Sequence, residues 1–211
     1  MDAKIIKTFG PSIVKVKIPE KIVNDINEYV DKIIADKEKS KNLNLGPKLA
    51  GDVTQEILLE GKFLQEIGWL QFLVNCASKW IEFETRKKIK QFNVSSSWVV
   101  RQFKNEYNPV HWHSGHISGA GFLKVPKSLG SHSQDKGDKK YVGGNLNLIH
   151  GAHQFLSRSI YEVKPEVGDF YFFPHYVMHT VYPFKGTDEE RRSISFNATI
   201  DEEIFDVYGK Y

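Results

Sequence analysis

The sequence predicts a mostly β protein whose helices are confined to the N-terminal part of the chain. From about residue 95, short apolar runs rich in β-branched and aromatic residues follow one another, separated by connections rich in Gly, Pro, Asn, Ser and Lys. Before that point, hydrophobic residues recur at helical spacing in two longer segments. Many short strands at this spacing are typical of an antiparallel sandwich or barrel, and not of alternating β-α-β units.

Two helical segments are expected in the first half of the chain. The first begins near Pro19, which a first helical turn tolerates, and the Lys-rich stretch DKEKSKN ends it. The second covers roughly residues 61–90 and closes on RKKIK, basic residues that suit the negative pole of a helix C-terminus. Both segments are expected to pack an apolar face against a sheet. The residues of these faces are Ile22, Val23, Ile26, Val30, Ile33 and Ile34, and then Phe63, Leu64, Ile67, Leu70, Leu73, Val74 and Trp80.

The expected strands are the runs SSSWVVRQFK, GAGFLKV, GNLNLIH, SIYEV, GDFYFFP, HTVYPF and RSISFNATI. A polar segment rich in Gly, Ser and Lys, residues 126–144, interrupts them. A connection of this length is either a lid over a site or an exposed insertion, and the residues alone leave both interpretations open.

The composition is that of an ordinary globular protein, with 40% hydrophobic and 26% charged residues among 211. The net charge of +3 is too small to indicate binding to nucleic acid or to a membrane. Cys76 is the single cysteine, so an internal disulfide is excluded. The sequence has no apolar run of about 18 residues and no secretory leader pattern at its start. A soluble, cytoplasmic protein is therefore expected.

Histidines gather in the second half of the chain. All eight lie there, and HWHSGHISG places three of them within six residues. Alternate residues of a strand share a face, so His111 and His113 are expected to direct their ring nitrogens toward one point. Neutral imidazole is a common ligand of Fe(II) and Zn(II). The expected third ligand is His179, which opens the strand after the run that ends at Pro174.

A polar face is also predicted on the last long strand. Its alternate residues are Arg191, Ser193, Ser195 and Asn197, whereas Ile194 and Phe196 occupy the other face. A buried polar face that carries an arginine requires an anionic partner.

In these motifs the sequence resembles the 2-oxoglutarate/Fe(II)-dependent oxygenases, and within them a branch with a His-x-His, His and Arg-x-Ser-x-Ser-Phe-Asn pattern. The resemblance covers about residues 95–200. Its elements are His111-Trp-His113, Ser118-Gly119, Pro165-Glu-Val-Gly-Asp169, Phe173-Pro174, His179 and Arg191 to Asn197. It implies a double-stranded β-helix, a jelly-roll barrel related to the cupins. A single domain of residues 1–211 is then expected, with a helical buttress and the first strands in 1–92 and the jelly-roll catalytic core in 93–203.

The resemblance also implies the chemistry. His111, His113 and His179 would bind Fe(II), and 2-oxoglutarate would chelate the iron while its far carboxylate pairs with Arg191 and accepts a hydrogen bond from Ser193. A planar guanidinium suits this because it engages a carboxylate through two parallel bonds. With O2, the enzyme would hydroxylate a substrate and release succinate and CO2.

The chain departs from the superfamily at residue 113, where most members have Asp or Glu. Three imidazoles leave the full +2 charge on the iron, and this changes its redox tuning. In a second alignment, His113 is the first ligand and Gly115 stands at the carboxylate position, which leaves an open coordination site as in halide-transferring relatives. A slip of one residue would likewise exchange Arg191 for Arg192 as the anchor, on the face of Ile194 and Phe196.

Other residues are weaker candidates. Asn105 and Tyr107 are placed to reach the co-substrate from a strand end, and Asn197 shares the face of Arg191. His116 is assigned to the rim and Asp169 to a turn, and loops or the barrel mouth are expected for the rest, His150, His153 and His175.

Two other functions remain open: a three-histidine, cupin-like dioxygenase without 2-oxoglutarate, and a non-catalytic metal-binding barrel. The primary substrate is not specified, because a protein residue, an amino acid, a nucleobase or a metabolite fits such a barrel, whose specificity lies in its loops. A homodimer is compatible with the sequence.

Overall fold

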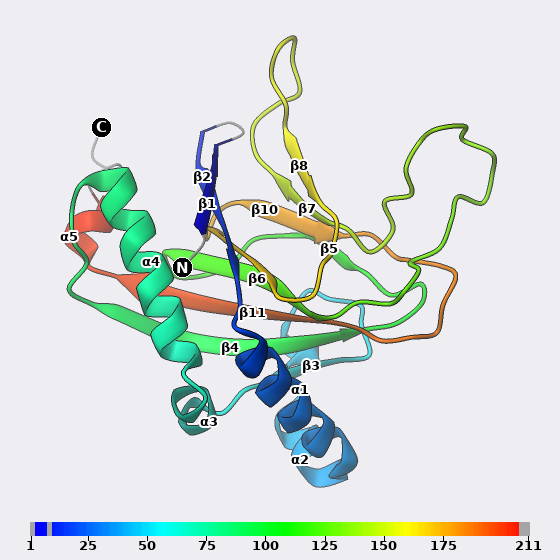
Figure 1. Ribbon diagram of the computed structural model, residues 1–211, viewed down its shortest axis with the longest axis horizontal. Helices are drawn as coiled ribbons and strands as arrows, with labels where there is room; N and C mark the ends of the chain where they lie inside the picture. The colour runs from blue at the N-terminus through cyan, green and yellow to red at the C-terminus, as the bar shows by residue number, and fades with distance from the viewer. Residues whose placement is uncertain (1–2, 8–9, 207–211) are drawn as a thin grey trace.

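The computed structural model describes residues 3–7 and 10–206, which form two antiparallel sheets (Figure 1). In strand order, the larger sheet consists of β1 (Ala3–Lys7), β2 (Ser12–Lys17), β9 (Asp169–Pro174), β6 (Ile117–Lys124), β11 (Arg191–Ile200), β4 (Phe92–Gln102) and β3 (Gln55–Leu58). The smaller sheet consists of β5 (Asn108–His111), β10 (Met178–Val181), β7 (Leu146–Ile149) and β8 (Ile160–Val163). The prediction of a mostly β protein with antiparallel pairing is confirmed.

Two long helices and several short ones precede the central strands, and one further short helix follows them. They are α1 (Glu20–Ala35), α2 (Lys37–Asn42), the 3-10 turn η1 (Gly46–Lys48), α3 (Gly61–Glu66), α4 (Trp69–Thr85) and α5 (Glu202–Phe205). In the described part of the chain, none of them is long and apolar enough to cross a membrane.

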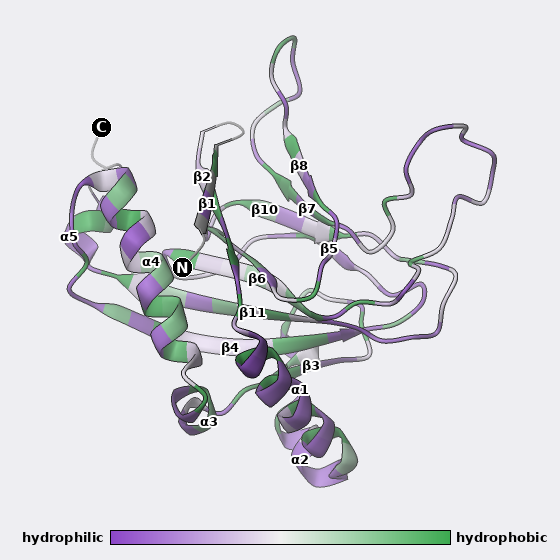
Figure 2. Cartoon of the chain, in the orientation of Figure 1, coloured by the Kyte–Doolittle hydropathy of each residue, from purple (hydrophilic) through white to green (hydrophobic). Residues whose placement is uncertain are grey.

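The two long helices cover one face of the larger sheet. Their buried side chains, among them Ile26 of α1 and Leu73 of α4, join one apolar cluster with Val99, Ile194 and Phe196 from the strands. Figure 2 shows that both helices alternate between hydrophobic and hydrophilic positions, as expected for helices with one face on a sheet. This packing confirms the predicted buttress and leaves the other face of the larger sheet turned toward the smaller sheet.

The central strands alternate as the sequence predicted. Ile194 and Phe196 are fully buried on the helix side. Ser193 lies on the opposite face of β11. Its partners across the neighbouring strands are Val100 of β4 and Phe122 of β6. The register therefore places Arg191 and Ser193 between the two sheets.

The helix boundaries differ from the prediction at two places. DKEKSKN ends α1 but then forms α2, because the Asp36 side chain accepts a hydrogen bond from the Lys39 N–H at 3.0 Å and caps a new helix. The second segment is two helices separated at Gly68, whose φ of +79° is left-handed. It ends at Thr85, so RKKIK lies beyond the helix.

The long polar segment 126–144 forms no helix or strand, and Figure 1 shows it extending away from the sheets. Its residues do not contribute to the lining of the cavity between the sheets. Its last residue, Gly144, nevertheless approaches that cavity through its carbonyl group, which accepts a hydrogen bond from Arg191.

Candidate metal centre and adjoining cavity

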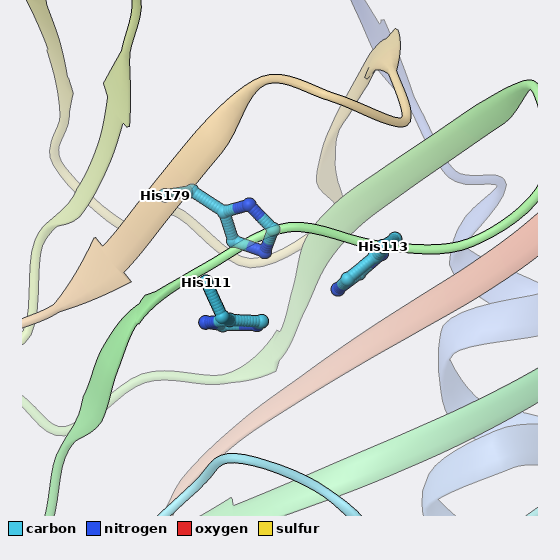
Figure 3. A group of neighbouring side chains, drawn as sticks. All are labelled: His111, His113 and His179. Carbon is cyan, nitrogen blue, oxygen red and sulfur yellow. The ribbon is translucent and has the colours of Figure 1, made fainter.

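Three histidine side chains converge between the sheets (Figure 3). One ring nitrogen each of His111, His113 and His179 lies within 4.8 Å of the others. The ring centroids are 4.2 Å apart for His111 and His179, 4.7 Å for His113 and His179, and 5.4 Å for His111 and His113. These separations suit three ligands around a single ion.

The smaller sheet brings two of these histidines together. β5 and β10 pair so that His111 and His179 are direct partners across the strands. The expectation that His113 shares a strand with His111 is wrong, because β5 ends at His111. His113 follows in a turn, where its N–H donates to the His175 carbonyl at 3.0 Å and its own carbonyl accepts from His175 Nδ1 at 3.2 Å.

Backbone carbonyl groups orient two of the rings. Nδ1 of His111 donates to the Pro109 carbonyl at 2.7 Å, and Nδ1 of His179 donates to the Val177 carbonyl at 3.1 Å. A carbonyl only accepts, so each Nδ1 carries the proton and each Nε2 keeps its lone pair for a metal. Nδ1 of His113 is buried and has no hydrogen-bond partner within the described residues.

Burial keeps these imidazoles neutral. It lowers the pKa of His113 to about 3 and the pKa of His179 well below the usual 6.5, and it also lowers the pKa of His111. Three buried, neutral rings with converging lone pairs fit a divalent transition metal. The group consists of histidines alone, so the fit is to a three-nitrogen site without a carboxylate.

The place of His111 favours the first alignment over the second. The second alignment discards His111 as a ligand, yet His111 lies within the histidine group together with His113 and His179. At Gly115, φ is +89°, and a Cβ atom would lie 2.7 Å from the Ala198 carbonyl oxygen, so the position requires glycine in either alignment.

A cavity of about 340 Å³ adjoins the histidines. Its wall includes the predicted polar face of β11, namely Arg191, Ser193, Ser195 and Asn197. The cavity thus joins the histidine group and the predicted arginine in one space.

Arg191 is a buried cation without an anion. It is 1% exposed, and its guanidinium donates to the Gly144 carbonyl at 3.0 Å and to Gln102 Oε1 at 3.1 Å. Its Nη1 also lies 3.4 Å from Ser193 Oγ. Among the described residues it forms no ion pair with a carboxylate, and burial lowers its pKa to about 10. Arg191 therefore remains protonated at neutral pH and is available to an anionic ligand.

Arg192 lies on the opposite face of β11, against α1. Its guanidinium contacts Asp31 at 2.6 Å and Glu190 at 2.9 Å, and it donates to Asn27. These partners satisfy its charge, so the alternation of the strand selects Arg191 as the arginine of the cavity.

The remaining predicted residues lie in different places. Asn105 and Tyr107 do not line the cavity: Asn105 occupies a turn with φ of +67°, and Tyr107 pairs its backbone with Asp52. Asn197 lines it and accepts from Ser118 Oγ at 2.9 Å. His116 stacks on Phe205 of α5, with ring centroids 3.7 Å apart.

Three further residues lie outside the histidine group. His150 and His153 do not line the cavity. Asp169 contacts Lys15 and Lys17 of β2, each at 2.6 Å.

The sequence did not indicate one buried residue of the wall, Glu56. It comes from β3, a four-residue strand whose run QEIL gives no clear period. Residues 48–51, in the connection between η1 and β3, also line the cavity.

Comparisons with known proteins agree with this architecture. The family model described as "Putative 2OG-Fe(II) oxygenase" matches residues 96–197. No curated protein sequence matches the chain. Among solved structures, a prolyl-4-hydroxylase of Pseudomonas putida is 15% identical with a TM-score of 0.53, over 88% of this chain and 91% of that one.

Two further solved structures are similar. The viral collagen prolyl hydroxylase of Paramecium Bursaria Chlorella virus-1, in its 2OG complex, is 14% identical with a TM-score of 0.53 over 88% of this chain and 94% of that one. HygX of Streptomyces hygroscopicus, with nickel, 2-oxoglutarate and hygromycin B bound, is 11% identical with a TM-score of 0.55, over 87% and 81%. At these identities the likeness establishes the fold, a double-stranded β-helix. Residues 96–197, just under half of the chain, are similar in sequence to the 2OG-Fe(II) oxygenase family.

Proposed function

We propose that this oxygenase domain binds Fe(II) through His111, His113 and His179 and 2-oxoglutarate through Arg191 and Ser193. We further propose that it hydroxylates an organic substrate and releases succinate and CO2. The observation that carries the assignment is Arg191, a buried cation with no anionic partner among residues 3–7 and 10–206, in the same cavity as three converging neutral imidazoles.

The bound iron, with O2 and 2-oxoglutarate, supplies the oxidising power of such a reaction. The protein's residues hold and orient the reactants. The backbone-bonded rings of His111 and His179 present Nε2, and with His113 they would hold the iron through three nitrogen atoms, a set small enough to let it also take up the co-substrate and O2. The surrounding apolar wall, including Phe122 and Leu146, keeps water from the reacting atoms.

Arg191 suits the far carboxylate of 2-oxoglutarate because its guanidinium is already held in place. The Gly144 carbonyl and Gln102 fix two of its donors, so little side-chain entropy is lost when a carboxylate binds. The hydroxyl group of Ser193, next to Nη1, is a further donor for the same carboxylate.

The three-histidine set makes the co-substrate part of the charge balance. Neutral ligands would leave +2 on the metal, and Arg191 adds a third positive charge. The dianion 2-oxoglutarate, with Arg191 at its far end, would offset two of these three charges. A three-histidine dioxygenase that uses no oxo-acid, or a metal-binding barrel, would have no use for an unpaired buried arginine here.

The structural neighbours do not narrow the substrate. A prolyl-4-hydroxylase and a protein with hygromycin B bound share this fold, so both a protein side chain and a small molecule are compatible with it. A cytoplasmic location is part of the proposal and is supported by the single cysteine, Cys76, which is buried.

Anaerobic titration of the Fe(II)-loaded protein with 2-oxoglutarate tests the assignment. A weak absorption band at roughly 500 nm is expected as 2-oxoglutarate chelates the Fe(II). In Arg191→Met the apparent affinity for 2-oxoglutarate is expected to fall on the order of 100-fold, because a charge-assisted pair is lost. Arg158→Met, which removes an exposed arginine in the connection between β7 and β8, is the matched control and should bind normally. Tight metal binding without any response to 2-oxoglutarate would refute the proposal.

A further inference from the structure

Glu56 is a buried acid in the cavity wall that the proposed reaction does not use. The residue is 2% exposed, and its Oε2 has no hydrogen-bond partner within the described residues. No ion pair involves it there, and burial alone raises its pKa to about 7. An unpaired carboxyl group in such a place destabilises the fold, so its presence calls for a ligand.

The sheet register places Glu56 beside the proposed co-substrate site. Glu56 on β3 lies opposite Val100 on β4, and Val100 lies opposite Ser193 on β11. Two strand spacings, roughly 10 Å, therefore separate Glu56 from Ser193. The register therefore puts Glu56 on the same wall as the carboxylate anchor, two strands away from Ser193.

The connection after η1 lies close against this acid. A Cβ atom at Gly51 would lie 2.8 Å from Asn108 Nδ2 and 3.1 Å from Glu56 Oε1, so glycine lets the backbone approach both side chains. Gly51, Glu56 and Asn108 all line the cavity. They form a polar corner, here called the Glu56 corner, across the wall from Arg191.

At this corner no cationic side chain of the described residues pairs with Glu56. Arg191 faces the proposed anionic co-substrate, and the three neutral histidines face the proposed metal. Lys48 lines the cavity but is exposed, and it forms no ion pair with Glu56 within the described residues. The remaining ligand, the primary substrate, is the group that would pair Glu56.

We propose that the Glu56 corner selects a primary substrate that carries an organic cation with N–H donors, an alkylguanidinium or alkylammonium group, and that the Glu56 carboxylate pairs with it. This inference rests on the proposed function, which assigns the histidines to the metal and Arg191 to 2-oxoglutarate. The cationic group comes either from a free metabolite or from a peptide side chain, and the two sources share the same contact with Glu56.

Paired probes of similar size, one cationic and one neutral, test this contact. Propylguanidinium is compared with the neutral propylurea, and n-butylammonium with n-butanol, as free ligands. Nα-acetyl-arginine N-methylamide is compared with the citrulline analogue as the peptide source. Dissociation constants are measured by ligand-observed NMR on the protein loaded with Zn(II) and 2-oxoglutarate, and again on the protein without added metal.

At least one cationic probe is expected to bind about tenfold more tightly than its neutral partner. The preference should disappear in Glu56→Gln, which keeps the shape of the side chain but removes its charge. It should persist in Glu66→Gln, a control that removes an exposed carboxylate of α3. A preference confined to the arginine peptide assigns the cation to a peptide, and an equal preference with the free probes assigns it to a small molecule.

Two results would overturn the inference. One is the lack of a cation preference in every pair, and the other is a preference that Glu56→Gln leaves unchanged. Binding of 2-oxoglutarate to the same Zn(II) samples is measured separately. If 2-oxoglutarate binds while no cation is preferred, the inference on Glu56 fails and the proposed function stands. If 2-oxoglutarate does not bind, the proposed function fails, and the measurements without added metal decide whether Glu56 binds a cation.

Discussion

The buried charged residues of β11 and β3 differ in whether other side chains of the protein neutralise their charge. Arg192 has three acidic or amide partners, whereas Arg191 has only neutral ones and Glu56 has no ion-pair partner within the described residues. Residues that destabilise the fold unless a ligand is bound are typical of functional sites. Arg191 could be predicted from the alternation of its strand, but Glu56 could not, because its function depends on the burial of a short edge strand.

The raised pKa of Glu56 predicts a pH-dependent stability. Its pKa is about 7 in the fold and about 4.5 as the reference value. As pH rises from 4.5 to 7, the unfolded chain ionises first, so the stability that the protonated form provides is lost across this range. Glu56→Gln should therefore match the native protein near pH 4.5 and exceed it above pH 7 by up to about 3 kcal/mol.

Urea unfolding of the ligand-free protein from pH 4.5 to 8 measures this difference. Glu66→Gln, an exposed position, should give a difference close to zero at every pH. A stability difference for Glu56→Gln that stays constant with pH, or that favours the native residue above pH 7, would show that Glu56 has a structural partner.

At the scale of elements, the alternation of side chains along β11 places its two arginines on opposite faces of the sheet, where they have different partners. Arg192 is fully buried between β11 and α1, and Glu190 and Asp31 pair with it. Arg192→Met removes these contacts, while Arg101 still pairs with Glu190 and Lys124 with Asp31. The variant should therefore lower the free energy of unfolding by about 1–3 kcal/mol. Arg191→Met removes an unpaired cation and should leave stability nearly unchanged.

Chemical denaturation of both variants, together with 2-oxoglutarate binding, makes a reciprocal test. Arg192→Met that still folds should bind 2-oxoglutarate, and Arg191→Met should not bind it at native affinity. The reverse pattern would mean that the register of β11 differs from the one described here.

The segment that carries His113 forms hydrogen bonds with His175, which lies in the connection between β9 and β10. His175 contacts it through three hydrogen bonds, of which only the one from Nδ1 to the His113 carbonyl involves the side chain. Removing an outer partner of a metal ligand typically weakens metal binding 10- to 100-fold. His175→Ala is therefore expected to lower Zn(II) affinity by roughly tenfold in a chelator competition, and His153→Ala, outside the cavity, should not. Equal affinities for His175→Ala and the native protein would contradict this role.

This turn also shows where sequence patterns fail. The spacing of His111 and His113 predicted a shared strand, yet the strand ends at the first of them. The backbone contacts between His113 and His175, 62 residues apart, complete the histidine group instead. The local spacing of the histidines identified the ligand residues. It could not predict the tertiary contacts that orient their side chains.

At the scale of the whole molecule, each of the two sheets contributes different residues to the site. The larger sheet binds the helices on one face and presents Arg191, Ser193 and Glu56 on the other. The smaller sheet contributes His111 and His179. The periodicity of the sequence predicted the helices, most strands and this polar face, whereas the resemblance was needed to predict that the sheets close into a jelly roll.

The most direct test is an anaerobic crystal structure with Fe(II) and 2-oxoglutarate, with the ion located by its anomalous scattering. One ion is predicted within bonding distance, about 2.0–2.3 Å, of a ring nitrogen of His111, His113 and His179. One carboxylate of 2-oxoglutarate should lie on this ion, and the other should pair with Arg191. An ion bound without these three histidines, or 2-oxoglutarate bound away from Arg191, would contradict the account.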